Sequence, residues 1–187
     1  MTPAAPLNAA RITTRQIALW LGPGDWLAML ATAACAFGLA CLWQGWLAAL
    51  LFVPLGAAVA AIVVIDLRHF RIPDRLSLPL IPLGLIHAAL TGPVWPRLLA
   101  MTAVWAGLTL LQRVFQHLRG KSGLGGGDVK LITAAAAGPS LEVLPFYVLA
   151  ASVSALMWAL ALGANRNRRL AFGAHLAPWL LGFALFA

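Results

Sequence analysis

Two aspartates, Asp66 and Asp128, stand where this sequence could do chemistry. Asp66 closes a long apolar run, and Asp128 follows the glycine cluster 123–127 and precedes another apolar segment. Two carboxylates that share a site cannot both ionise easily, so one keeps a proton while the other is charged. The charged one can take a proton from water, and the neutral one can donate to a carbonyl or a leaving nitrogen. The pair therefore suits aspartic peptide hydrolysis, which needs neither a metal nor a nucleophilic side chain.

The composition places these acids in a membrane protein. The 187 residues are 62% hydrophobic and only 10% charged, with a mean hydropathy of +0.90, whereas about a quarter of a soluble domain is charged. An ionisable group at the edge of a membrane helix indicates function, because burying its charge in hydrocarbon is costly. We therefore expect an all-α polytopic membrane protein, a bundle of about six to seven transmembrane helices.

The apolar runs divide the chain into a tail and a membrane domain. Residues 1–25 form an N-terminal cytoplasmic tail without a signal-peptide cleavage site, and 12–21 could lie in the interface. The membrane-embedded peptidase domain is predicted over 26–187. Its expected crossings, with prolines kinking the third, are 26–43, 46–65, 76–90, 98–114, 129–140, 141–162 and 172–186.

The basic residues predict which side of the membrane the loops face. Of the 13 lysines and arginines, all but Arg97 fall in the tail or in loops 66–75, 113–130 and 164–170. Since such residues concentrate in cytoplasmic loops, both Asp66 and Asp128 are expected at the cytoplasmic edge. The net charge of +8 is then explained without a nucleic-acid partner.

Cysteines and histidines give no sign of a metal or cofactor site. Cys35 and Cys41 lie in one apolar helix and point to different faces, which suits neither a zinc pair nor a disulfide. The four histidines are scattered. We interpret His69 and His117 as solvated loop residues, and His87 and His175 as membrane-facing packing.

The residues around the two aspartates have roles of their own. Gly125, Gly126 and Gly127 are interpreted as a flexible approach to Asp128, free of side chains, against which an extended substrate backbone could lie. Three glycines in a row serve no packing purpose in a helix, and their flexibility would let Asp128 move toward Asp66. A helix beginning near Asp128 would favour its charged form, which makes Asp66 the proton holder.

Asp25 and Asp74 are the other acids near helix starts. Each precedes an apolar run, and each is predicted to be a helix N-cap. Asp74 follows Ile72-Pro73, which forms one structural motif with it.

Two segments resemble the type IV prepilin leader peptidases, membrane aspartic proteases of the Gly-x-Gly-Asp type. Segment 66–79 is similar to the family's first catalytic aspartate followed by an Ile-Pro-Asp/Asn element, here Ile72-Pro73-Asp74. Segment 125–131, Gly-Gly-Gly-Asp-Val-Lys-Leu, is similar to its second catalytic motif. The resemblance spans roughly 46 to 187 and implies that Asp66 and Asp128 are catalytic.

The chain departs from this family in two places. Longer members carry a cysteine-rich cytoplasmic insert associated with zinc and with N-methylation of the cleaved pilin. Its absence here implies a peptidase without N-methyltransferase activity. The family often shows Pro-Phe-Gly-Pro before its last span, where this chain has Ala171-Phe172-Gly173-Ala174. We expect this to affect the path of the final helix and not the catalytic pair.

The leading hypothesis is a membrane aspartic endopeptidase of the bacterial inner membrane. Its active site would face the cytoplasm and remove the leader peptide of type IV prepilins or pseudopilins. The alternative is a small proton- or cation-coupled transporter or assembly subunit, but transporters hold acids near the midplane, often with internal repeats. Among proteases, a general intramembrane enzyme of the presenilin type is the runner-up. Type IV pilins, tight-adherence pilins and secretion-system pseudopilins remain open as substrates, and so does the oligomeric state.

Overall fold

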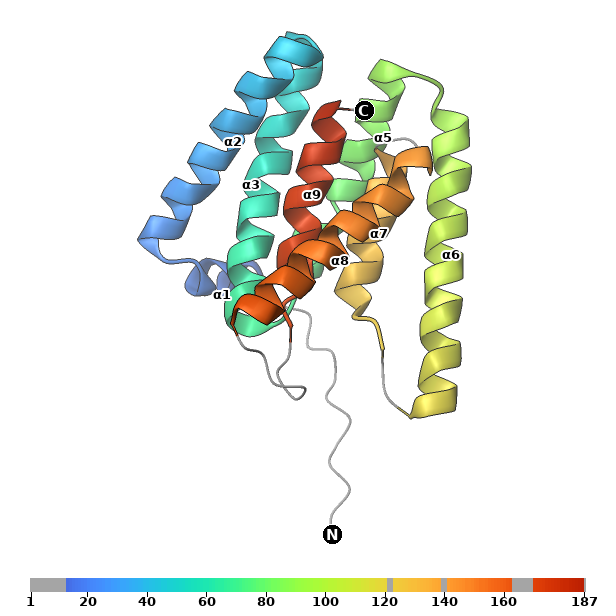
Figure 1. Cartoon of the computed structure of the whole chain (residues 1–187). Coiled ribbons are helices and arrows are strands. Elements are labelled where there is room, and N and C mark those ends of the chain that lie inside the picture. Colours follow the sequence, from blue (N-terminus) through green and yellow to red (C-terminus); the bar gives the residue numbers. More distant parts are fainter. Residues whose placement is uncertain (1–12, 121–122, 139–140, 163–169, 187) are drawn as a thin grey trace.

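The computed structural model describes residues 13–120, 123–138, 141–162 and 170–186, and all its regular elements there are helices (Figure 1). They are α1 (Thr14–Trp20), α2 (Pro23–Trp43), α3 (Trp46–His69), α4 (Asp74–Ser77), α5 (Leu80–Thr91), α6 (Val94–Arg119), α7 (Gly126–Ala137), a 3-10 turn (Leu141–Val143), α8 (Leu144–Ala161) and α9 (Gly173–Phe186). The expected all-α polytopic membrane protein is confirmed.

Four helices in the described part are long and apolar enough to cross a membrane. They are Pro23–Trp43, Trp46–His69, Val94–Arg119 and Leu141–Ala161, with Gly173–Phe186 as a shorter apolar helix. Helices α5 and α7 have 12 residues each, or about 18 Å of rise, against a hydrocarbon core of about 30 Å. Seven full crossings therefore stay a prediction.

The short helices α7 and α9 form the centre of the bundle. In Figure 1, α9 lies between α3 and α8, and each of these helices contacts it. Leu131 of α7, Leu176 of α9 and Tyr147 of α8 are buried in one apolar cluster with Ile62 of α3. Helix α7 buries every residue from Leu131 to Ala137, because its small side chains let neighbouring helices approach closely.

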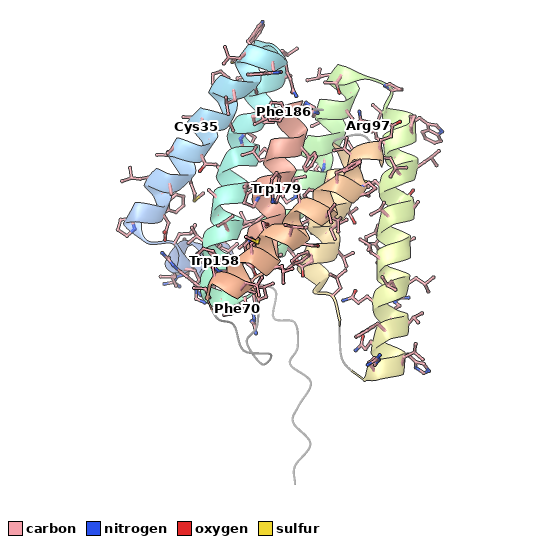
Figure 2. All side chains as sticks on the ribbon, viewed as in Figure 1. Cys35, Phe70, Arg97, Trp158, Trp179 and Phe186 are labelled. Carbon is pink, nitrogen blue, oxygen red and sulfur yellow. The ribbon has the colours of Figure 1, made fainter. Side chains whose placement is uncertain are left out.

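The outer helices present large apolar side chains to their surroundings. Helix α6 buries only Ala100, and side chains project from α2 and α6 away from the bundle (Figure 2). Trp43 and Trp46 are 64% and 71% exposed at the turn between α2 and α3. Gly45 makes that turn with a φ of 84°, which favours glycine. Exposed apolar surface on this scale suits lipid.

The predicted third crossing, 76–90, is not one helix. Instead, α4 ends at Ser77 and α5 begins at Leu80, with Pro79 as its N-cap. A proline removes a backbone N–H and clashes with the preceding turn, so the helix is interrupted at Leu78 and Pro79, which both keep right-handed helical dihedral angles as in a kink. Pro82 falls in the first turn of α5, where its missing N–H has no partner within the helix.

The predicted polar loop 113–130 is also shorter than expected. Helix α6 continues to Arg119 and ends at Gly120, whose φ is 65°. Residues 113–119 contain no proline or glycine, and His117 and Arg119 in the last turn complement the negative end of the helix dipole. A helix can thus run past the membrane edge where its residues turn polar.

Part of the predicted N-terminal tail is folded. Thr13 and Gln16 form a capping box that starts α1, and Ile17 and Leu21 are buried against Ala61 and Ile65 of α3. The boundary predicted at residue 25 falls inside α2, and residues 1–12 lie outside the described part.

Asp25 is not the N-cap of α2. That position is Gly22, and Asp25 lies in the first turn. Its carboxylate accepts the Gly22 N–H at 2.7 Å and pairs with Arg68 at 2.6 Å. From the third helical position a carboxylate reaches back to the capping residue's N–H, so Asp25 still closes the helix start.

Candidate active site

Asp66 lies in the last turn of α3, and its side chain is directed at another helix. The residue is 4% exposed. Its Oδ2 accepts the backbone N–H of Ala174 at 2.8 Å, and the N–H of Gly173 also donates to this carboxylate. Both donors belong to the first turn of α9. Asp66 is thus held where the free N–H groups of a helix start gather.

Asp128 lies in the first turn of α7 and is half-buried. Gly125 is the N-cap of this helix, and its N–H donates to the Asp128 carboxylate. The site therefore holds Asp128 by its own helix, in the way that a capping residue is held. Both aspartates face a helix N-terminus, so the dipole argument that made Asp66 the proton holder no longer distinguishes them.

The fold brings the two predicted catalytic residues together. They come from motifs far apart in sequence, yet the charge of Asp66 acts on Asp128. Helix α9 contacts both α3 and α7, and it thereby joins the two ends that carry the acids. That the two acids form one catalytic site stays a prediction.

Ile72 of the Ile-Pro-Asp motif packs between these helix ends. A Cβ on Gly127 would lie 2.6 Å from the Ile72 Cβ, and a Cβ on Gly173 would lie 2.3 Å from the Ile72 Cδ1. Such contacts are too short for real side chains, so a larger residue at either position would force Ile72 to shift. The interpretation that the three glycines serve no packing purpose is therefore wrong for Gly127.

The three glycines before Asp128 differ from one another. Gly125 caps α7, and a Cβ there would lie 2.8 Å from the Asp128 Oδ2. Gly126 has no atom within 4 Å of its Cβ position. Gly126 and Gly127 belong to the first turn of α7 and not to a loop. Of the three, only Gly126 has open space at its Cβ position.

Asp74 is not a helix N-cap. The N-cap of α4 is Pro73, and Asp74 is the first helical residue without a capping hydrogen bond. Its carboxylate instead forms an ion pair with the Lys130 Nζ. Lys130 follows Asp128 by two residues, so the pair ties the Ile-Pro-Asp motif to the helix of the second aspartate. Lys130 belongs to the second motif, 125–131, but the sequence predicted no partner for it.

His175 belongs to the surroundings of Asp66. Its Nδ1 lies 3.3 Å from the Ser154 Oγ of α8, and the Trp179 Nε1 donates to the same hydroxyl at 3.2 Å. The charges of His175 and Asp66 act on each other. His175 is half-buried beside the exposed Trp158 and Trp179, so its membrane-facing packing stays a prediction. In the sequence, its position two residues after Gly173, next to the counterpart of Pro-Phe-Gly-Pro, indicates that His175 lies near Asp66.

His87 lies inside the bundle and not on its membrane face. It is 5% exposed, and its Nε2 is 2.7 Å from the Gln44 Oε1. The Gln44 Nε2 donates to the carbonyls of Ala184 and Leu185 at 2.8 and 3.0 Å. His69 is exposed and stacks on Trp20, whereas His117 is exposed on α6.

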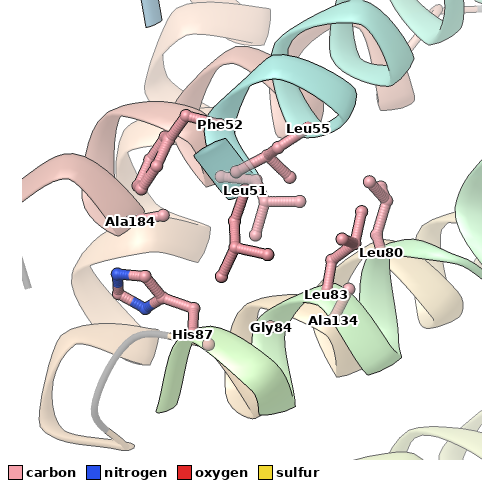
Figure 3. A pocket seen from close by; sticks show the side chains of 11 residues that line it. Leu51, Phe52, Leu55, Leu80, Leu83, Gly84, His87, Ala134 and Ala184 are labelled. Atoms are coloured by element: carbon pink, nitrogen blue, oxygen red, sulfur yellow. The ribbon is translucent and has the colours of Figure 1, made fainter. Parts of the chain in front are cut away.

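A small, largely apolar pocket of about 20 Å³ lies beside His87 (Figure 3). Its lining comes from α3, α5, α7 and α9 and includes Phe52, Leu83 and Leu180, but neither Asp66 nor Asp128. Figure 2 places Phe70, which follows α3, at the end of the molecule opposite Phe186 and Arg97. The pocket and the two acids are therefore separate features.

Among the residues that the structure describes, no three His, Cys, Asp or Glu side chains form a group able to hold a metal ion. Cys35 and Cys41 are free thiols on α2. The reactive groups at the site are thus the two carboxylates, with His175 beside them.

Residues 53–160 match the type IV leader peptidase family. Similar curated proteins are named prepilin leader peptidase/N-methyltransferase. Those of Xanthomonas campestris pv. campestris and Neisseria gonorrhoeae are 35% and 34% identical over 77% and 78% of this chain, and 50% and 52% of their own length. That of Aeromonas hydrophila is 35% identical over 81% of this chain and 53% of its own.

The chain spans about half the length of these curated relatives. No solved structure matches it. The family match covers more than half of the chain and contains Asp66, Ile72 and Asp128. With its helical membrane architecture, this multi-pass bacterial membrane protein belongs to the type IV leader peptidase family.

Proposed function

We propose that this chain is a membrane aspartic endopeptidase that removes the leader peptide of type IV prepilins or pseudopilins. The observation that carries the proposal is the meeting of Asp66 and Asp128, each held by backbone N–H groups at a helix start. The names of the similar proteins support the choice of substrate.

The proposed reaction needs only the two carboxylates and a water molecule. One carboxylate takes a proton from the water, which attacks the scissile carbonyl, while the other donates a proton to that carbonyl oxygen. A proton then passes to the leaving nitrogen as the peptide bond breaks. Since two adjacent carboxylates do not both ionise easily, one acid and one base coexist at the same pH.

We place the active site at the cytoplasmic face of the membrane. Arg68, Arg71 and Arg75 follow Asp66 closely, and Lys130 follows Asp128. Positive residues concentrate on the cytoplasmic side of membrane proteins, which supports this orientation. The hydrophobic helix of a prepilin would then lie in the bilayer next to the bundle, with its leader in the cytoplasm.

We also propose that this chain cleaves without methylating its product. In longer members of the family that this chain resembles, N-methylation is associated with a cysteine-rich insert. The two cysteines of the present 187 residues both lie in α2, where they form no such element. Mass spectrometry of the mature pilin made by the purified chain tests this, and an added methyl group would refute it.

The main experiment measures cleavage of a candidate prepilin by the purified chain in detergent or liposomes. Asp66→Asn and Asp128→Asn should each abolish cleavage while the protein still inserts and folds, because an amide cannot exchange the proton that the reaction needs. Glu142→Gln is the control, since Glu142 is exposed in the 3-10 turn and should cleave like the wild type. Near-normal cleavage by either Asp→Asn variant would refute the aspartate pair.

A further inference from the structure

The first turn of α9 contacts the Asp66 carboxylate directly. The Ala174 N–H donates to the Asp66 Oδ2 at 2.8 Å in a buried setting. The next two N–H groups, of His175 and Leu176, both bond to the Phe172 carbonyl at 3.0 Å. The Ala174 N–H belongs to the part of a helix that has no partner within the helix, so Asp66 satisfies it.

Gly173 makes this approach possible. A Cβ at this position would lie 3.0 Å from the Asp66 Oδ2 and 2.3 Å from the Ile72 Cδ1. Only a residue without a side chain lets the helix start come this near to both. The first turn of α9 therefore lies against the Asp66 carboxylate, with Ile72 packed beside it.

Asp66 depends on another helix for such donors. It lies at the C-terminal end of α3, where the backbone groups left free are carbonyls and not N–H groups. Asp128 differs, because its own N-cap Gly125 supplies a donor. Without α9, Asp66 would have no backbone donor comparable to the one that α7 gives Asp128.

We propose that the backbone N–H of Ala174 is a positioning group for Asp66, fixing Oδ2 so that proton exchange with water and substrate falls to Oδ1. This inference rests on the proposed peptidase function and concerns how that site is held. Charged or titratable groups facing the pair from the packed helices are His175 on α9 and Tyr147 on α8. The Asp74–Lys130 ion pair lies between α4 and α7.

The position is informative because the resembling family often has proline there. Proline has no N–H, so a chain with Pro-Phe-Gly-Pro could not make this contact at the residue matching Ala174. The contact is therefore a feature of this chain that tunes the site and is not an absolute requirement of the reaction. Proline is also well tolerated in the first turn of a helix.

The test removes the donor in two ways: by proline, whose Cδ takes the place of the amide hydrogen and points at the Asp66 Oδ2, and by a change that adds no ring. Ala174→Pro removes the N–H, whereas Ala174→Ser and Ala174→Gly keep it and serve as matched controls. The ester analogue made by incorporating lactic acid at position 174 removes the same N–H without proline's ring. For cleavage of one prepilin, kcat and KM are measured together with thermal unfolding in the same detergent.

We expect kcat to fall about tenfold in the ester form, as for the loss of a hydrogen bond to a charged group, and at least as far in Ala174→Pro. KM should stay within about twofold, because the contact does not touch substrate. Both controls should cleave like the wild type. If Ala174→Pro unfolds early, the ester form decides.

Unchanged kcat in a folded donor-free form would overturn the inference, and so would a rise in KM alone. An equal loss in the serine and glycine controls would also overturn it, because they keep the N–H. Failure of the proposed function is a different result: the wild-type chain itself would leave prepilin uncleaved.

Discussion

The helix end that carries Asp66 and the one that carries Asp128 are built in opposite ways. Asp66 ends the long helix α3, is 4% exposed and takes its donors from α9. Asp128 begins the short helix α7, is half-buried and takes a donor from its own N-cap. One acid is held by tertiary packing and the other by local structure. We infer that Asp66 is the fixed member of the pair and that Asp128 is the one able to adjust when substrate binds.

This difference explains why the glycines of the site are not equivalent. Gly173 faces both Asp66 and Ile72, the nearest neighbour of Gly127 is Ile72, and Gly126 faces open space. Substitutions at these three positions should therefore separate the packing of Asp66, the packing of α7 and the approach of substrate.

The largest effect is expected at the Asp66 end. Gly173→Val would push α9 away from Asp66 and Ile72, and cleavage should fall about a hundredfold, as for a catalytic group misplaced by about 1 Å. The double variant with Ile72→Ala should recover little, because the new side chain still meets the Asp66 Oδ2. Cleavage is measured at matched expression. Full recovery in the double variant would show that Asp66 does not depend on α9.

Gly127→Val should have a smaller and reversible effect. The three atoms nearest to its Cβ position all belong to Ile72, so cleavage should fall about tenfold through displacement of α7, since overpacking shifts the backbone. Membrane insertion should change little. Combining it with Ile72→Ala should restore most of the activity, as measured by prepilin cleavage with the single Ile72→Ala variant as control. Failure of this rescue would place the effect on substrate and not on Ile72.

The sequence predicted the acids and the helical membrane architecture, because both depend on local patterns. Long apolar runs ending at Asp66 or beginning after Asp128 are visible without the fold. The prediction failed for contacts made by distant segments: Ala174 with Asp66, Ile72 with Gly127 and Lys130 with Asp74. The predicted helix end near residue 114 was wrong because polar residues were interpreted as a loop, whereas α6 continues through them to Arg119. A fall in hydropathy indicates the edge of the membrane and not the end of a helix.

Gly126 tests the remaining part of the substrate-approach hypothesis. Because no atom lies within 4 Å of its Cβ position, Gly126→Val should fold normally and place a branched side chain in open space at the start of α7, the helix that carries Asp128. If substrate backbone lies there, KM should rise about fivefold while kcat changes little, as expected for lost substrate binding. Unchanged KM would mean that substrate reaches Asp128 from another direction.

The smallest effect is expected at the Asp74–Lys130 ion pair, which ties the Asp66-side motif to the Asp128 helix. The side chains of Asp74 and Lys130 are 60% and 28% exposed, and ion pairs this open to solvent contribute little. Asp74→Asn should therefore lower cleavage by only about twofold, since it removes one charge and keeps the shape of the side chain. Lys130→Met should do the same, and the double variant should be no worse than either single one, because the two residues act through one contact. These activities are compared under one set of conditions at low and high salt, and the difference between wild type and variants should shrink as salt screens the pair. A loss as large as that of Asp66→Asn would instead make Asp74 part of the reaction.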